Sequence, residues 1–280
     1  MRELSCAAIA DAVAHLCIQA CTRLPEPVLR LLEEASQKEP FPPAQETLRL
    51  IRQNADIAQQ ECMPICQDTG MAVVYADVGQ EVHITGGLLA EAVNEGVRRG
   101  YTEGYLRKSV VADPIRRGNT GDNTPAVLHV RLIEGDRLRL TVAPKGFGSE
   151  NMSRLAMLTP AQGLEGVKAF VVETARLAGA NPCPPMMLGV GVGGTFEQVA
   201  ALAKEALVEM RDGPHPDPYY DALEQELTQA VNALGIGPQG FGGRTTALSV
   251  RIKAAPTHIA GLPVAVNVGC HVTRHASAEL

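Results

Sequence analysis

The chain has 280 residues, of which 45% are hydrophobic and 20% charged, and its formal net charge is −6. An acidic balance argues against nucleic-acid binding, because phosphate contacts need a basic face. No stretch approaches the roughly 20 apolar residues that a membrane span requires. The apolar N-terminal segment 1–21 is interrupted by Asp11 and His15, which favours an amphipathic helix over an export signal. We therefore expect a cytoplasmic protein with no membrane or nucleic-acid partner.

The first part of the chain is rich in helical patterns. Apolar residues recur at helical spacing in three segments, residues 1–21, 25–39 and 44–62. The PFPP stretch at 40–43 separates the last two, because proline ends a helix. A buried strand is predicted at 71–79 and a further helix at 88–104.

The rest of the chain mixes strands and helices. Two apolar-rich runs within 126–144 flank a Glu134-Gly135-Asp136 turn, which predicts a β-hairpin. Further helices are predicted at 161–178, 196–211 and 218–234, and late strands at 246–256 and 262–272. No repeat or linker is apparent, so the pattern predicts an α/β fold, a single domain of mixed sheets packed with helices that spans residues 1–280.

The seven cysteines differ in their local setting. In a reducing compartment they are expected to be thiols or metal ligands, not disulfides. Cys6, Cys17 and Cys21 lie in apolar helical surroundings, where cysteine behaves as a small buried hydrophobe. The setting of Cys62 is ambiguous.

Cys66, Cys183 and Cys270 instead lie in loop-like sequences, ICQDTG, NPCPP and VGCHVTRH. Thiolates from three distant loops suit a metal or iron–sulfur site better than a nucleophile, which needs only one thiol. The residues alone leave two interpretations open: a shared metal centre, or three unrelated buried thiols.

The GVGVGG stretch at 189–194 matches a dinucleotide-binding pattern. That fold needs a full strand before the glycines and a second strand, ending in an acid, after the helix. Here the preceding NPCPPMML is short and rich in proline. A glycine turn that feeds a helix N-terminus is the favoured interpretation, and dinucleotide binding ranks last.

Several polar segments carry candidate binding groups. KGFGSEN at 145–151 and NTGDNTP at 119–125 offer backbone N–H groups to an anion, or form tight turns capped by their own Asn and Asp side chains. The basic group Arg107, Lys108, Arg116 and Arg117 contains at most one functional member by this interpretation, the others forming a solvated face. His258, His271 and His275 are candidate proton carriers.

Five motifs together resemble a known family. ICQDTG, NTGDNTPAVLH, KGFGSENMSRLAMLTPAQG, NPCPPMMLGVGVGGTFEQVA and THIAGLPVAVNVGCH are similar to the iron–sulfur (class I) fumarase and L-tartrate dehydratase family. The resemblance covers most of residues 45–275, in the same order. It is to the alpha subunit of the two-subunit form and to the N-terminal domain of the single-chain form.

The resemblance implies a cofactor and a reaction. A [4Fe–4S] cluster would be held by Cys66, Cys183 and Cys270, with one iron left open as a Lewis acid. The expected reaction is the reversible hydration of fumarate to L-malate, with a small dicarboxylic acid as substrate. L-tartrate dehydration is the alternative, and a non-catalytic metal-binding subunit is a further one, in which the thiolates hold zinc or a cluster for structure alone.

The resemblance also implies roles for single residues. Gln67 would hydrogen-bond the substrate, and Asp68 would contact it and assist the group that moves the proton. Arg107 matches the arginine that contacts a substrate carboxylate, Gly148 a backbone donor to the substrate, and His258 a histidine that reaches the active site.

Single-chain members of the family carry a C-terminal domain that completes the site. This chain ends ten residues after Cys270. The resemblance therefore implies a separate beta subunit that supplies the missing groups, and an (αβ)2 assembly, since the family builds its sites near subunit contacts.

Overall fold

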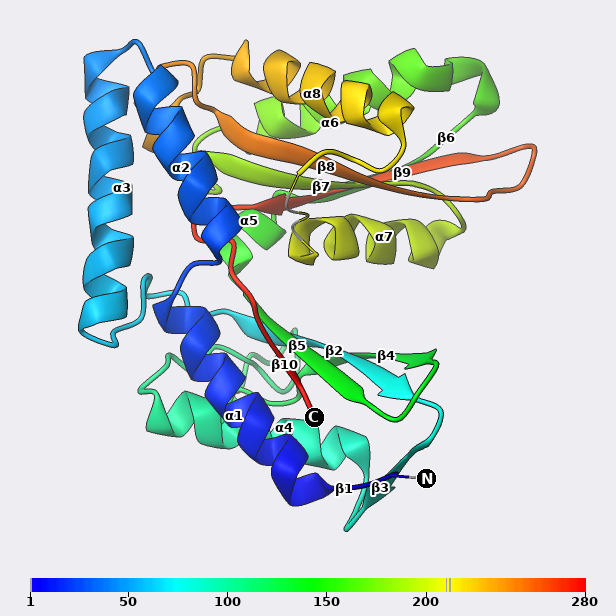
Figure 1. Ribbon diagram of the computed structural model, residues 1–280. Helices are drawn as coiled ribbons and strands as arrows, with labels where there is room; N and C mark the ends of the chain where they lie inside the picture. The colour runs from blue at the N-terminus through cyan, green and yellow to red at the C-terminus, as the bar shows by residue number, and fades with distance from the viewer. Residues whose placement is uncertain (1, 210, 212) are drawn as a thin grey trace. The chain divides into compact units, whose positions relative to one another are not determined.

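The computed structural model describes residues 2–209, 211 and 213–280 and forms a mixed α/β protein (Figure 1). Its four-stranded sheets each combine parallel and antiparallel neighbours, which confirms the predicted fold class. The chain forms two compact units. Unit 1 comprises Met1–Pro25, Ala55–Phe147 and Arg274–Leu280, and unit 2 comprises Glu26–Asn54 and Gly148–Thr273. Each unit has its own apolar core, and a single domain over 1–280 stays a prediction.

Unit 1 is a sheet with helices on one face. The strand order is β10-β5-β2-β4, where β2 is Met71–Gly79, β4 Val127–Ile133, β5 Leu138–Lys145 and β10 Ala276–Glu279. Helices α1 (Cys6–Thr22) and α4 (Leu89–Glu103) pack on the inward-facing side chains of β2 and β5. The predicted first helix is confirmed from Cys6 onward, where Ser5 caps it by accepting the N–H of Ala8. Residue 1 lies outside the described residues. The short β1 (Arg2–Ser5) pairs in parallel with β3 (Val82–Thr85).

The predicted hairpin at 126–144 is wrong. Both strands form, but β4 and β5 do not pair with each other, because β2 lies between them, parallel to β4 and antiparallel to β5. The turn at 134–136 crosses the end of β2 at Gly79, where a Cβ atom would lie 2.4 Å from the Gly135 carbonyl oxygen. The missing side chain of Gly79 thus permits a turn that crosses a strand.

Unit 2 is a sheet with helices on both faces. Its order is β6-β9-β7-β8, where β6 is Arg154–Leu158, β7 Met186–Gly193, β8 Ala247–Ala255 and β9 Leu262–Gly269. Helices α6 (Gly163–Ala178) and α8 (Pro218–Asn232) cover one face, and α7 (Phe196–Val208) covers the other (Figure 1). The helix predicted over 196–211 ends earlier, at Val208, and residue 210 lies outside the described residues.

The GVGVGG stretch has a packing role that differs from the predicted turn. Residues 189–193 belong to β7, and the chain turns at the last strand residue, Gly193, and at Gly194, with φ of +86° and +72°. Gly189 and Gly191 face α7, where a Cβ atom would lie 2.1 Å from the Ala203 carbonyl oxygen and 2.2 Å from that of Val199, respectively. The absence of side chains at these two glycines therefore lets α7 pack closely against β7. Close packing explains the glycine pattern without any nucleotide binding.

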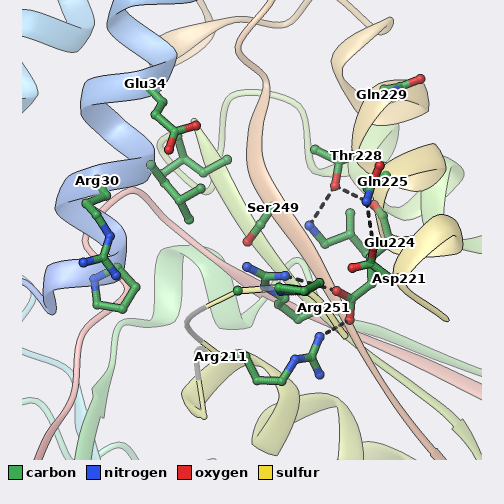
Figure 2. Close-up of a pocket in the computed structure, with 16 residues that line it drawn as sticks. Arg30, Glu34, Arg211, Asp221, Glu224, Gln225, Thr228, Gln229, Ser249 and Arg251 are labelled. Atoms are coloured by element: carbon green, nitrogen blue, oxygen red, sulfur yellow. Dashed lines mark hydrogen bonds and ion pairs between the residues drawn. The ribbon is translucent and has the colours of Figure 1, made fainter. Parts of the chain in front are cut away.

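Polar side chains of helix α8 cover the edge of β8 that has no neighbouring strand in the described part of the chain. Glu224, Thr228 and Asn232 lie four residues apart and accept the backbone N–H groups of Ile252, Val250 and Ala247, respectively. A buried edge without such partners would leave main-chain donors unsatisfied. A cavity of about 570 Å³ lies beside this edge (Figure 2), but its Arg211 and Arg251 both pair with the buried Glu224. We assign the cavity no ligand.

Helices α2 (Glu26–Lys38) and α3 (Pro42–Gln60) follow each other around the proline stretch, as predicted. Within the parts of the chain that the structure describes, no helix is both long and apolar enough to cross a membrane. α3 reaches 19 residues but carries charged side chains on several turns, among them Glu46, Arg49 and Asp56.

Glu39, between α2 and α3, is a buried carboxylate that joins two distant parts of unit 2. It accepts the N–H groups of Phe41, Arg244 and Thr245 and the Thr245 hydroxyl, at 2.7–3.2 Å. Burial by itself would raise the pKa of Glu39, but the hydrogen bonds from Arg244, Thr245 and Phe41 outweigh burial and lower it. The carboxylate therefore stabilises the folded state in its ionised form.

We expect Glu39→Gln to lower the free energy of unfolding by about 3 kcal/mol at neutral pH, because an amide NH2 would face main-chain donors. Since the pKa of Glu39 is lowered on folding, its stabilisation is complete above the ordinary carboxyl pKa and is lost as the pH falls below it. The difference in the free energy of unfolding between wild type and variant, measured by urea titration, should therefore become smaller as the pH is lowered. Glu34→Gln, at an exposed ion pair with Lys38, is the control, with an expected change within about 0.5 kcal/mol. Equal losses in both variants would contradict the prediction.

Candidate active site

The loop that carries Cys66, Gln67 and Asp68 is anchored in unit 1 by its main chain. Ile65 donates its N–H to the Cys21 carbonyl oxygen at 3.0 Å. The buried Tyr101 hydroxyl donates to the Thr69 and Gly70 carbonyl oxygens at 2.8 and 3.0 Å. These hydrogen bonds fix the backbone of the loop. The Gln67 side chain is exposed, and those of Cys66 and Asp68 are half-buried.

Asp68 is oriented by main-chain donors from two segments. Its Oδ1 accepts the N–H of Gly70 at 3.0 Å, and its Oδ2 accepts that of Phe147 at 2.9 Å. Phe147 belongs to the predicted KGFGSEN loop and opens the four-residue helix α5 (Phe147–Glu150). The Asp68 N–H in turn points to the Cys66 Sγ at 3.4 Å. The carboxylate thus ties the cysteine loop to the KGFGSEN loop.

Arg107 lies beside the same loop. Its carbonyl oxygen accepts the Thr69 hydroxyl at 2.9 Å, while its side chain is exposed. Asn123 is fully buried and reinforces this arrangement. Its Oδ1 accepts the N–H of Ser109 at 2.7 Å, and its Nδ2 donates to the Gly70 carbonyl oxygen at 3.2 Å. The structure therefore brings together Cys66, Gln67, Asp68 and Arg107.

The other two predicted ligands lie together in unit 2. Cys183 precedes β7 and Cys270 follows β9, and these ends are adjacent because Met187 pairs with Gly269. His271 donates from its Nδ1 to the Cys183 carbonyl oxygen at 2.8 Å. Cys183 is exposed and has a φ of +52°, and Cys270 is half-buried. The two cysteine loops are thus joined at one end of the sheet.

His258 lies at the opposite end of that sheet, where it is exposed in the turn before β9. β9 has eight residues, which at the strand rise separates its two ends by roughly 23 Å. Within one chain, the structure does not bring His258 to Cys183 and Cys270. Its catalytic role stays a prediction.

Gly148 is followed by a charged network that the sequence analysis missed. Lys204 donates to Glu150 Oε1 at 2.5 Å, and Asn267 donates to Glu150 Oε2 at 2.8 Å and to Ser153 Oγ at 3.0 Å. The network joins the KGFGSEN loop to β9, the strand that ends one residue before Cys270. Lys204 lies in an ordinary helical pattern, so no sequence signal distinguished it from a solvated lysine.

Arg274 is a second residue that the sequence analysis missed. It is only 5% exposed and donates from Nη2 to the Asp68 carbonyl oxygen at 2.5 Å. It lies four residues after Cys270 in the chain. The buried guanidinium thus holds the loop in place from its buried side through a hydrogen bond to a backbone carbonyl oxygen. The sequence gives no sign of this role, because a single arginine after a motif forms no recognisable pattern.

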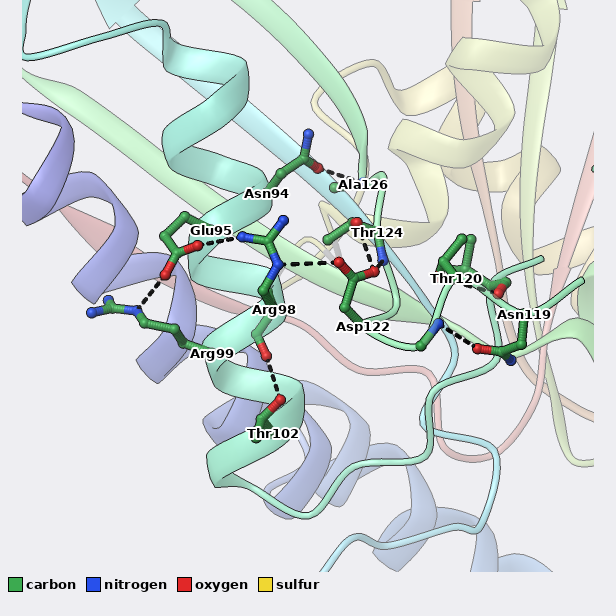
Figure 3. A network of polar contacts seen from close by, with 12 residues as sticks. Asn94, Glu95, Arg98, Arg99, Thr102, Asn119, Thr120, Asp122, Thr124 and Ala126 are labelled. Atoms are coloured by element: carbon green, nitrogen blue, oxygen red, sulfur yellow. Dashed lines mark hydrogen bonds and ion pairs between the residues drawn. The ribbon is translucent and has the colours of Figure 1, made fainter. Parts of the chain in front are cut away.

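The NTGDNTP loop is a self-capped turn, the second of the two interpretations offered above (Figure 3). Asn119 accepts the N–H of Gly121, and Asp122 accepts both the N–H and the hydroxyl of Thr124. The two hydrogen bonds from Thr124, with a further one from Arg98, lower the pKa of Asp122 to about 2. The backbone N–H groups of Gly121 and Thr124, which were candidates for binding an anion, are thus engaged by side chains of the loop itself.

The burial of the cysteines matches the predicted division for Cys17 and Cys21, whereas Cys6 is half-buried, like Cys66 and Cys270. Cys17 and Cys21 are buried, and burial raises the pKa of both thiols, whereas metals bind the thiolate. Cys66, Cys183 and Cys270 are exposed or half-buried in loops, and none of the seven cysteines, all of which the structure describes, is in a disulfide. The donor chemistry of these three thiols fits an iron–sulfur centre. Across residues 2–209, 211 and 213–280, no group of three or more His, Cys, Asp or Glu side chains is arranged to hold a metal ion.

Comparisons with known proteins agree with this organisation. The model of the fumarate hydratase (Fumerase) family matches residues 10–279. A Methanocaldococcus jannaschii protein, provisionally named L(+)-tartrate dehydratase subunit alpha, is 40% identical over 274 residues, 96% of each chain. The L(+)-tartrate dehydratase subunit alpha of Escherichia coli strain K12 is 30% identical over 272 residues, 96% of this chain and 89% of the relative.

The protein is therefore an enzyme of the hydro-lyase class, which adds water to a carbon–carbon double bond or removes it. The chain belongs to the fumarate hydratase (Fumerase) family, together with the alpha subunits of class I fumarate hydratase and L-tartrate dehydratase. This membership confirms the resemblance found in the sequence.

Proposed function

We propose that this chain is the alpha subunit of a two-subunit [4Fe–4S] hydro-lyase that reversibly hydrates fumarate to L-malate. The observation that carries the proposal is the match of the fumarate hydratase family model across residues 10–279. The names of the relatives, which end in "subunit alpha", support a separate beta subunit as partner. An (αβ)2 assembly is part of the proposal.

In this proposal Cys66, Cys183 and Cys270 hold the cluster. When bound, a cluster with one iron free of protein ligands supplies a Lewis acid for the hydroxyl oxygen that is added or removed. The support is chemical: these three thiols lie in loops within reach of solvent, whereas burial keeps Cys17 and Cys21 protonated.

The chain's own residues then bind and orient the dicarboxylic acid. The exposed Arg107 guanidinium pairs with one substrate carboxylate, since its fork matches the two oxygens. The exposed Gln67 amide and the Gly148 N–H donate hydrogen bonds to the substrate. Asp68, whose two oxygens are each held by a main-chain N–H, contacts the substrate in a fixed orientation and steers the group that exchanges the C3 proton.

His258 has a particular place in this proposal. Because it lies at the far end of the sheet from its own Cys183 and Cys270, it serves the active site of a second copy within (αβ)2. The adjacent Ile259 is 91% exposed, as expected for a turn that meets another chain.

Mixing two inactive variants tests the role of His258. In a symmetric dimer, chains with Cys66→Ser and chains with His258→Ala would form mixed assemblies in which one of the two sites is intact. We expect activity to return to about a quarter of the wild-type value, since half of a random mixture is mixed and each mixed dimer has one good site. No recovery on mixing would place His258 at its own chain's site, and full activity of the His258→Ala chain by itself would place His258 outside the reaction.

The reaction itself is tested with the complete enzyme. The alpha chain, purified with its beta subunit and kept free of oxygen, should hydrate fumarate and dehydrate L-malate. No turnover of malate or of either tartrate would refute the hydro-lyase proposal.

L-tartrate dehydration is the second candidate, because the relatives at 40% and 30% identity carry that name. The two substrates differ by one hydroxyl group. The ratio of kcat/KM for L-malate and L-tartrate decides between them, and a ratio below one assigns the enzyme to tartrate.

A further inference from the structure

Residues 105–117 of unit 1, the basic loop, have a fixed shape without belonging to a helix or a regular strand. Val111 forms an antiparallel bridge with Asn119, and the Ala112 N–H donates to the Gly118 carbonyl oxygen at 2.7 Å. At the tip, Asp113 Oδ1 accepts the N–H groups of Ile115 and Arg116 at 2.9 and 2.6 Å. The loop is therefore held in one conformation by its own hydrogen bonds.

This ordered loop presents two large apolar side chains to solvent. Tyr105 is 93% exposed and Ile115 is 87% exposed. Single exposed apolar residues are common, but two of this size, nearly fully exposed on a rigid loop, have the character of anchors for a protein surface. Holding them in place before binding reduces the entropy lost on association.

The same loop is strongly basic. It contains Arg107, Lys108, Arg116 and Arg117 against the single acid Asp113, in a chain whose net charge is −6. Among the residues that the structure describes, none of these four bases forms an ion pair with the chain's own acids, although ion pairs are frequent elsewhere. A partner with an acidic surface would complement these charges.

The loop is also attached to the candidate active site. The Arg107 carbonyl oxygen accepts the Thr69 hydroxyl, and the N–H groups of Ser109 and Val110 both reach Asn123 Oδ1. Asn123 contacts in turn the Gly70 carbonyl oxygen. A partner seated on the basic loop would border the Cys66 loop and limit its access to water.

We propose that the basic loop is a docking surface for the beta subunit, with Ile115 and Tyr105 as anchors in apolar pockets of a beta surface that bears acidic groups. This inference rests on the proposed two-subunit function. Arg107 keeps its substrate role, and Arg116 and Arg117 steer the two subunits together.

The test measures the affinity of full-length alpha chains for the beta subunit by sedimentation or calorimetry. Ile115→Ser and Tyr105→Ser should each weaken binding by about 10- to 100-fold, the range for an interface anchor. The double variant R116E/R117E should weaken binding and remove most of its salt dependence.

Matched controls in the same unit are Leu132→Ser, at a side chain that is 71% exposed on β4, and Arg23→Glu, at an exposed arginine. Both controls should bind like wild type.

The outcomes separate this inference from the proposed function. If the loop variants bind beta with wild-type affinity and salt dependence while the complex turns over its acid, the docking surface is wrong and the function stands. If the controls weaken binding as much as the loop variants, the docking surface is also wrong. If wild-type alpha neither binds beta nor turns over any of the acids with it, both proposals fall.

Discussion

Cys66→Ser is expected to leave a folded chain that retains no complete cluster and loses activity at least about 100-fold, since even outer-shell changes at metal sites cost 10–100-fold. Folding should survive, because the Cys66 Sγ accepts one N–H, from Asp68 at 3.4 Å, and a serine hydroxyl can accept the same bond. Metal binding should not survive, because a serine hydroxyl is not ionised at neutral pH and offers no soft donor to iron.

Iron content after anaerobic reconstitution is the direct measurement, read beside the visible absorption of the cluster and the melting temperature. Cys62→Ser is the closest control, since Cys62 is exposed four residues earlier and should affect neither iron nor activity. Cys17→Ser should lower stability, because it buries a hydroxyl in an apolar core, but should keep iron. Normal iron retention in Cys66→Ser, or equal loss in Cys62→Ser, would overturn the ligand assignment.

Gly189→Ala is expected to lower the free energy of unfolding by about 3 kcal/mol or more, the upper range for overpacking of a core. A Cβ atom at this position would lie 2.1 Å from the Ala203 carbonyl oxygen and 2.7 Å from the Leu207 nitrogen, both of which belong to the main chain of α7. A flexible side chain could move away from the added methyl group, but a helix backbone has to shift as a whole. The strand and the helix would therefore separate along their contact.

Urea unfolding followed by circular dichroism measures this loss. Gly118→Ala is the matched control, because a Cβ atom there would meet nothing within 4 Å, and its effect should stay within about 0.5 kcal/mol. Similar stability of the two variants would show that the main chain of α7 does not lie in close contact with Gly189 of β7. An insoluble Gly189→Ala chain beside a normal Gly118→Ala chain would agree with the prediction.

The strands of unit 1 show where local patterns stop being informative. Two apolar-rich runs and a turn at 134–136 correctly identified β4 and β5 as strands, but wrongly predicted that they pair with each other. β2, more than fifty residues earlier, lies between them. A turn signal describes chain reversal, whereas pairing depends on which strand completes the buried face against α1 and α4.

The candidate site shows the same limit. Cys66, Gln67, Asp68 and Arg107 were all named from motifs, and the structure places them around one anchored loop. Asn123, Lys204 and Arg274 were not named, because their importance comes from contacts with main-chain or charged groups far away in the chain, at separations of 53, 54 and 206 residues. A hydrogen bond over such a separation leaves no periodic trace in a sequence.

By itself, the sequence determined the α/β class, the positions of most helices and strands, the sorting of cysteines into apolar helices and polar loops, and the family. These features depend on side-chain periodicity, turn residues and contiguous motifs, which act over a few residues. Only the tertiary structure decided that β2 separates β4 from β5, that Gly189 and Gly191 are packing residues, and that His258 and Cys270 lie at opposite ends of one strand. Those outcomes depend on which buried surfaces and main-chain donors meet after folding, because an unpaired polar group or a steric overlap in the core costs more free energy than any local preference supplies.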